Sequence, residues 1–126
     1  MKEPSRKPTD AELAILRILW SRGPSTVRDV AAAMDRESAY TTVLKLLQIM
    51  TGKRLVVRDE SARTHVYEAA HSEEQMQRHL VADLLDRAFE GSAATLLMRA
   101  LSAKKTSPKE LAEIRKLLKS KSGGSP

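Results

Sequence analysis

Apolar residues recur at helical spacing in three segments of the N-terminal part of the chain, and polar capping residues bound them. Thr9 and Glu12 fit the capping box that opens a helix, and Gly23-Pro24 ends that helix. A second, shorter helix is expected from Ser25 or Thr26. The pattern therefore predicts a pair of short helices joined by a tight turn.

The third apolar segment predicts a helix that begins at Ser38, a natural N-cap, and ends at Gly52. Polar residues share the other side of this helix, so one face is available for a partner. The apolar positions that we expect in the core are Tyr40, Val43, Leu44, Leu47 and Met50.

After this helix the apolar period changes from helical to alternating. Residues 55–58 and 64–68 are rich in β-branched and aromatic side chains, and the polar run 59–62 between them is typical of a tight turn. Three short helices followed by a hairpin with a charged tip is the order of a winged helix-turn-helix.

Helical spacing returns from Ser72 onward, in three further helices that are broken at Gly91 and before Ser107. A lobe of about fifty residues rarely encloses a core of its own, so its apolar stripes are expected to meet a second copy of the chain in a C2 dimer. The residues expected in that interface are Met76, Leu80, Leu84, Phe89, Leu97, Leu101, Leu111, Ile114 and Leu118.

The predicted fold is therefore mainly α with a small β-hairpin. Residues 1–71 are expected to form a winged-helix DNA-binding domain and residues 72–120 a helical dimerisation domain, with 121–126 as a disordered tail. No apolar run approaches the roughly 18 residues that span a bilayer, and no signal peptide is apparent, so we expect a cytoplasmic protein without membrane insertion.

Charge and composition limit the kinds of partner and functional site that this chain can have. The chain has 22 Lys and Arg against 16 Asp and Glu, a formal charge of +6, which permits an anionic partner. It has no cysteine, which excludes disulfides, cysteine-based zinc sites and thiol catalysis. Aromatic residues make up only 3% of the chain, which disfavours base stacking on single strands. We expect no cofactor and no metal.

The third helix and the hairpin carry the candidate chemistry. The second helix of a helix-turn-helix enters the major groove and reads base edges near its N-terminus, while a wing meets phosphates. Each of these polar residues alone is compatible with a solvated surface, but their order favours double-stranded DNA. The expected contacts are Ser38, Thr41, Thr42, Lys45, Lys53, Arg54, Arg58, Arg63 and His65.

The sequence also offers alternatives to DNA binding. Ser102 and Lys105 match the Ser-x-x-Lys pattern of serine penicillin-recognising enzymes, but those enzymes need two further motifs and a larger fold. The histidines show no His-Glu-x-x-His spacing. A winged helix that binds a protein instead of DNA, and a regulator that responds to a small molecule, both remain open.

Two long runs, LRILWSRGPSTVRDVAAAM and AYTTVLKLLQIMTGKRLVVRDE, resemble the penicillinase-repressor (BlaI/MecI-type) family of bacterial transcription regulators. The runs RTHVYEA and LLDRAFEGSAATLL also stand where that family has them. The resemblance implies a homodimeric repressor that binds a DNA dyad operator. It also implies a membrane sensor-protease system that relieves repression by a cut in the dimerisation lobe.

The chain departs from that family in two places. Arg99 and Ala100 stand where the best-known repressors of the family have the Asn-Phe pair that is cut. The copper-responsive branch carries a C-terminal cysteine cluster, and this chain has no cysteine. The resemblance thus makes Arg99-Ala100 the candidate cleavage position and excludes metal control of the copper type.

Overall fold

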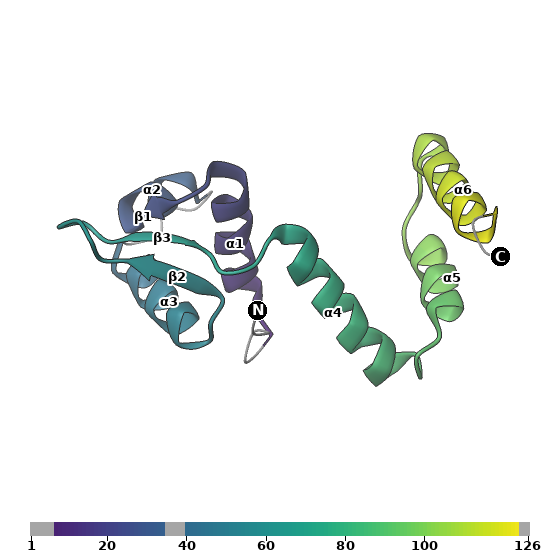
Figure 1. The fold of residues 1–126 in the computed structure, drawn as a ribbon, viewed down its shortest axis with the longest axis horizontal. Coiled ribbons are helices and arrows are strands. Elements are labelled where there is room, and N and C mark those ends of the chain that lie inside the picture. The colour runs from purple at the N-terminus through teal and green to yellow at the C-terminus, as the bar shows by residue number, and fades with distance from the viewer. Residues whose placement is uncertain (1–6, 35–39, 124–126) are drawn as a thin grey trace. The chain divides into compact units, whose positions relative to one another are not determined.

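The structure is a computed structural model that describes residues 7–34 and 40–123, in two units, Met1–Val81 and Ala82–Pro126 (Figure 1). The elements follow the predicted order of three helices, a hairpin and three further helices, with one additional short strand. They are α1 (Asp10–Arg22), β1 (Ser25–Thr26), α2 (Val27–Ala33), α3 (Tyr40–Gly52), β2 (Val56–Asp59), β3 (Val66–Ala69), α4 (Glu73–Ala88), α5 (Ala93–Ala103) and α6 (Pro108–Gly123).

Local capping explains where the first helices begin. The Thr9 hydroxyl accepts a hydrogen bond from the Glu12 backbone N–H at 3.2 Å, and a Glu12 carboxylate oxygen accepts one from the Thr9 N–H at 2.8 Å. Thr26 and Asp29 form the same reciprocal pair at the start of α2, with both bonds at 3.1 Å. The predicted capping box at Thr9 is confirmed, and a second box at Thr26 opens the expected second helix. The predicted cap at Ser38 lies outside the described residues.

The sheet of the N-terminal unit is antiparallel, with strand order β1-β3-β2. In its register, Tyr67 of β3 lies between Ser25 of β1 and Arg58 of β2. The predicted hairpin is present, with strands shifted by one or two residues toward the C-terminus. The strand Ser25–Thr26 was not expected, but the expected start of the second helix at Thr26 is confirmed, because Thr26 caps α2 and Val27 is its first residue.

The core of this unit lies between the three helices and the sheet (Figure 1). Tyr40 corrects the sequence prediction: it is 49% exposed rather than buried, and Leu44 is only partly buried. The buried apolar residues are Ile15, Leu16, Leu19, Val27, Val30, Val43, Leu47, Met50, Leu55, Val56, Tyr67 and Met76.

The beginning of α4 belongs to the same core. Met76 is only 1% exposed, and Leu80 packs against the cluster. The Trp20 indole N–H donates to the His71 carbonyl at 2.9 Å, which joins α1 to the segment before α4. Met76 therefore has almost no surface left for a second copy of the chain, contrary to its expected role in a dimer interface.

The unit Ala82–Pro126 contains the end of α4 together with α5 and α6. Ser92 caps α5 by accepting a hydrogen bond from the Thr95 N–H at 3.1 Å, and Ser107 accepts one from Glu110 before α6. Gly91, with a φ of 80°, ends α4 at the predicted break. Residues 121–123 were expected in a disordered tail, but α6 continues to Gly123.

Side chains in the unit Ala82–Pro126 are less buried than those in the first unit. None of its described residues is buried, and large apolar side chains are exposed, among them Met98 at 57% and Leu117 at 58%. Among residues 7–34 and 40–123, no helix is both long and apolar enough to cross a bilayer. The described part of the chain also holds no cluster of three or more side chains suited to binding a metal ion.

Candidate nucleic-acid interface

Helix α3 has one buried face and one exposed polar face. Val43, Leu47 and Met50 fix the helix in the core and are each 0% exposed. Thr41, Thr42, Lys45 and Gln48 are exposed on the other side. Because the buried residues fix the rotation of the helix, its hydroxyl groups and one ammonium group are presented together to solvent.

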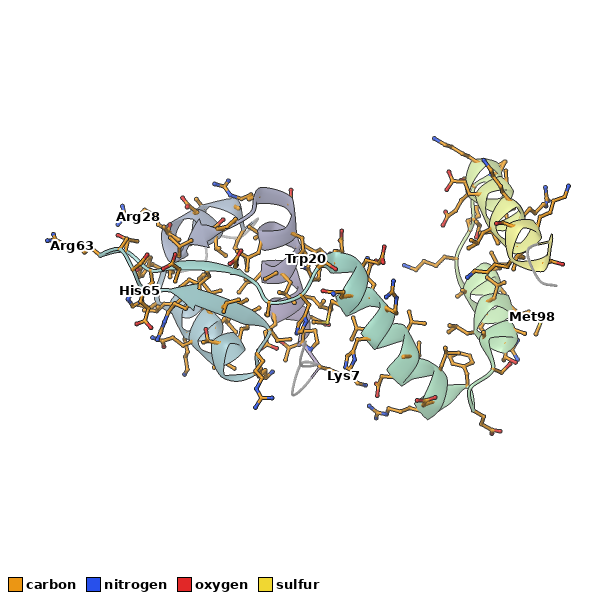
Figure 2. The ribbon with its side chains drawn as sticks, in the orientation of Figure 1. Lys7, Trp20, Arg28, Arg63, His65 and Met98 are labelled. Carbon is orange, nitrogen blue, oxygen red and sulfur yellow. The ribbon has the colours of Figure 1, made fainter. Side chains whose placement is uncertain are left out.

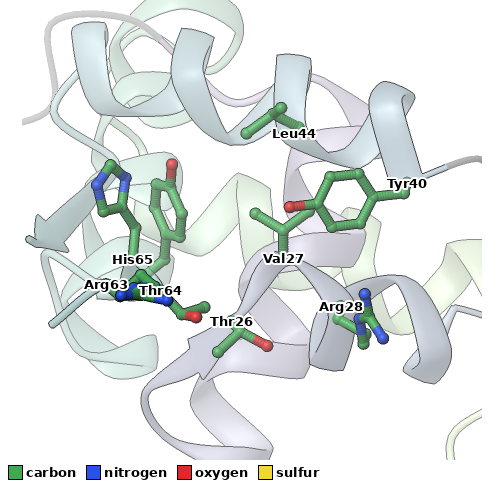
Figure 3. Close-up of a pocket in the computed structure, with 9 residues that line it drawn as sticks. Thr26, Val27, Arg28, Tyr40, Leu44, Arg63, Thr64 and His65 are labelled. Atoms are coloured by element: carbon green, nitrogen blue, oxygen red, sulfur yellow. The ribbon is translucent and has the colours of Figure 1, made fainter.

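A cleft of about 470 Å³ lies beside this face, bounded by α2, the first turns of α3 and the hairpin (Figure 3). Val27, Leu44 and Tyr67 supply apolar surface to it. Tyr40 reaches into it from the start of α3, which accounts for the exposure of that ring (Figure 3). A cleft with apolar walls and polar rims at the front of α3 is suited to receive an elongated polar ligand.

The rim of the cleft carries the positive charge. Arg28 comes from α2, and Arg63 and His65 come from the hairpin (Figure 3). Arg63 extends from the tip of the hairpin, away from the rest of the unit (Figure 2), and has no ion-pair partner among the residues that the structure describes. Guanidinium groups bind phosphate oxygens well because their donors form a planar fork.

Two other ionisable side chains of the hairpin, Arg58 and His65, lie beside the Glu60 carboxylate. Arg58 lies 3.3 Å from Glu60, and His65 lies 3.7 Å from the same carboxylate. Hydrogen bonding with Tyr67, followed by the attraction of Glu60, raises the pKa of Arg58. Hydrogen bonds from the Ser61 side chain and backbone lower the pKa of Asp59, whose carboxylate holds the turn at the tip.

Lys53 was expected to contact DNA; in the structure its ammonium group makes an ion pair within the fold. Its Nζ lies 2.8 and 3.0 Å from the two carboxylate oxygens of Glu12, which is only 2% exposed. Burial works against ionisation of Glu12, but hydrogen bonds from Lys53 and Thr9 outweigh it and lower the pKa of that carboxyl. Lys53 thus ties the end of α3 to the start of α1.

Arg54 is exposed, but it lies at the opposite end of α3 from the cleft. At about 1.5 Å per residue, roughly 20 Å of helix separates it from Tyr40. Its φ of 64° places it in the left-handed region, where the chain turns from α3 toward β2. The structure therefore gathers Thr41, Thr42 and Lys45 with the hairpin cations, and leaves Lys53 and Arg54 apart from them.

Two residues that line this surface were missed by the sequence reasoning. Arg28 follows the Thr26 cap on the first helix of the motif, a helix that usually crosses the DNA backbone, so its position gave a usable signal. Tyr40 was assigned to the core because it stands three residues before Val43. Its hydroxyl group and its place in the first turn were the hints that it could face a polar partner.

Comparison with known proteins gives two solved structures of low similarity and two sequence relatives. The structure of an ArsR family transcriptional regulator is 19% identical, with a TM-score of 0.49 over 68% of this chain and 81% of that one. Bordetella bronchiseptica BpsR, from a study of how 6-hydroxynicotinic acid regulates its DNA binding, is 20% identical with a TM-score of 0.47, covering 96% and 79%.

Two sequence relatives with higher identity are named as transcriptional regulators. The Transcriptional regulator BlaI of two Mycobacterium tuberculosis strains, H37Rv and CDC 1551, is 39% identical over 82 residues. The match covers 63% of this chain and 59% of those proteins, so the chain spans about three fifths of their length. The family model described as Penicillinase repressor matches residues 8–120. Since that match covers most of the sequence, the chain belongs to the penicillinase repressor family.

Proposed function

We propose that the protein is a cytoplasmic transcriptional repressor that binds a dyad operator in double-stranded DNA as a homodimer. The observation that carries this proposal is the exposed polar face of α3 beside a cleft rimmed by Arg28, Arg63 and His65. Membership of the penicillinase repressor family and two relatives named as transcriptional regulators support the same function.

The geometry suggests how DNA is bound. Helix α3 enters the major groove, where the Thr41 and Thr42 hydroxyls bond base edges or their methyl groups pack on thymine. Lys45 reaches a guanine or a phosphate. The phosphate strand that borders the groove passes the cleft, so that Arg28 and Arg63 hold it from two sides. Ser38 remains a proposed contact outside the described residues.

The dimer is proposed from the second unit. Its apolar side chains are too exposed for a unit that works alone, since large exposed patches usually mark an interaction surface. A second copy related by a two-fold axis would cover the same surface on both chains and would match the symmetry of a DNA dyad. The expected interface residues Leu84, Phe89, Leu97, Leu101, Leu111, Ile114 and Leu118 all remain at least partly exposed.

Release by proteolysis is the proposed control. Arg99 and Ala100 are exposed on α5, but a protease binds an extended segment, so the helix has to open locally. Because α5 has no residue buried within its own chain, its opening breaks few intrachain contacts, and it would also loosen the proposed interface at Leu97 and Leu101. A membrane sensor-protease system, as the family resemblance implies, would deliver the cut. An engineered protease site at Arg99-Ala100 tests whether cutting there releases DNA.

Footprinting on the DNA upstream of the protein's own gene tests the proposed function. The expected result is protection of two half-sites separated by about 10 base pairs or a multiple of that spacing. A protein that protects no site and does not shift mixed-sequence duplex DNA at low salt would instead be a winged helix that binds another protein.

A further inference from the structure

The end of the hairpin, residues 58–65, is the proposed wing of this protein, and it carries no net charge. Residues 58–65 contain two arginines and two carboxylates, Asp59 and Glu60, so their formal charges cancel when histidine is neutral. The whole chain, by contrast, has a formal charge of +6. A hairpin that meets phosphates would bind them more strongly without these carboxylates, which raises the question of what each of them does.

The two carboxylates make different contacts. Asp59 accepts a hydrogen bond from the Ser61 backbone N–H at 2.9 Å and thereby builds the turn at the tip. Glu60 is 57% exposed, and each of its oxygens faces a nitrogen of another side chain: Oε2 lies 3.3 Å from Arg58 Nη2, and Oε1 lies 3.7 Å from His65 Nε2. Its two oxygens thus stand where the two free oxygens of a phosphodiester could stand.

Arg58 is not fully satisfied in this arrangement. Its Nε is buried and has no hydrogen-bond partner, although other nitrogens of the guanidinium contact Glu60 and Tyr67. An unpaired buried donor is unfavourable, so the contact with Glu60 leaves one hydrogen-bonding group of Arg58 unused. That donor is available to a second acceptor if the guanidinium exchanges Glu60 for a phosphate.

The two side chains that contact Glu60 also lie within reach of DNA. The Arg58 and His65 side chains are 31% and 43% exposed, and His65 lines the cleft beside α3. Arg63, at the tip, has no carboxylate partner among the described residues and can make the first contact. Contact at the tip would then bring a phosphate next to the Glu60 carboxylate.

We propose that Glu60 is an internal competitor for phosphate, which holds Arg58 and His65 until the DNA backbone displaces it. This inference rests on the proposed DNA-binding function. Its consequence is that Glu60 limits the affinity of the wing for any DNA, because each binding event has to break the ion pair with Arg58 and the contact with His65 and leave a carboxylate beside the phosphates. Wing contacts then add little unless α3 is also bound in the groove.

The test compares Glu60→Gln with Asp59→Asn in the full-length protein, using mixed-sequence duplex DNA. Both variants remove one negative charge from the wing, and the amide that replaces the Asp59 carboxylate keeps an oxygen that can accept from Ser61. Exposed ion pairs stabilise only weakly, so we expect Glu60→Gln to tighten binding roughly threefold. Asp59→Asn should tighten it less, through general electrostatics alone.

A second pair of variants separates competition from a general charge effect. In an Arg58→Ala background, most of the gain from Glu60→Gln should disappear, whereas the small effect of Asp59→Asn should persist. Equal gains from the two neutralising variants, or a Glu60→Gln gain that is unchanged without Arg58, would overturn the inference. If the unmodified protein bound no DNA at all, that result would instead overturn the proposed function.

Discussion

Glu12 and Lys53 connect two helix ends that are 41 positions apart in the sequence. The Glu12 carboxylate serves both the Thr9 cap and the Lys53 ammonium, and it is almost entirely removed from solvent. A buried carboxylate that loses its cation is left uncompensated, so this pair matters more to the fold than an exposed ion pair would.

Replacing Lys53 with methionine should therefore destabilise the protein by about 3 kcal/mol, because it strands Glu12. Urea unfolding of the full chain measures the change. Lys45→Met, which removes an equally charged but exposed lysine, should change stability by less than about 0.5 kcal/mol. The double variant Glu12→Gln/Lys53→Met should recover part of the loss; if it were less stable than Lys53→Met, the stranded charge would not be the cause.

The same pair predicts how stability depends on pH. The pKa of Glu12 is lowered in the folded protein, so the unfolded chain binds more protons in the acid range. This stabilisation is complete above the ordinary pKa of 4.5 and is lost as the pH falls through the lower folded value. We expect urea midpoints to decline on acidification below that point and to decline less steeply in Glu12→Gln. Parallel pH profiles for the two proteins would contradict this account.

At the scale of elements, we expect α3 to contact DNA bases and the hairpin to contact the phosphate backbone of DNA. Arg63→Ala should weaken binding to all duplexes alike and reduce the salt slope by about 1, because one phosphate contact is lost. Thr42→Ala should leave the slope unchanged and relax discrimination at one base position. Binding assays over a range of salt, on operator and mixed-sequence DNA, measure both. An unchanged slope in Arg63→Ala would place the wing away from the phosphates.

The elements could be predicted where their signals are local. The caps Thr9, Thr26 and Ser72 satisfy backbone groups three residues away, and all of them form as expected. The strand Ser25–Thr26 could not be predicted, since two residues show no alternation and the strand exists only by pairing with Tyr67 and Val66.

The candidate site was predictable to the extent that helical spacing decides it. Thr41, Thr42 and Lys45 fall on the exposed face because Val43 and Leu47 fix the opposite one. Spacing cannot tell a core position from the wall of a cleft, which is why Tyr40 was placed wrongly. Nor can it reveal a partner that is distant in sequence, which is why the ion pair between Lys53 and Glu12 was not predicted.

At the scale of the whole molecule, the boundary between units lies within α4, after Val81. A fragment ending at Val81 should fold and be monomeric, and it should bind a full dyad about 10²–10⁴ times more weakly than the intact chain, because the second half-site is no longer tethered. Sedimentation and gel shifts measure these effects. A full-length chain that sediments as a monomer at micromolar concentration would count against the dimer.

A fragment ending at His71 provides the matched comparison. It lacks Met76 and Leu80, which pack on the core of the first unit, so it should be less stable by about 2–4 kcal/mol than the fragment ending at Val81. Equal urea midpoints for the two fragments would show that α4 does not stabilise the first unit in solution.

The Trp20 hydrogen bond to His71 also gives the molecule a built-in optical probe. Trp20 is the chain's single tryptophan, and its indole ring senses the place where α1 meets the segment before α4. Its emission therefore reports on the first unit, while far-ultraviolet circular dichroism records the helices of both. If the second unit comes apart first on dilution or cutting, ellipticity will fall while the emission spectrum stays the same, and one unlabelled sample will reveal the order of events.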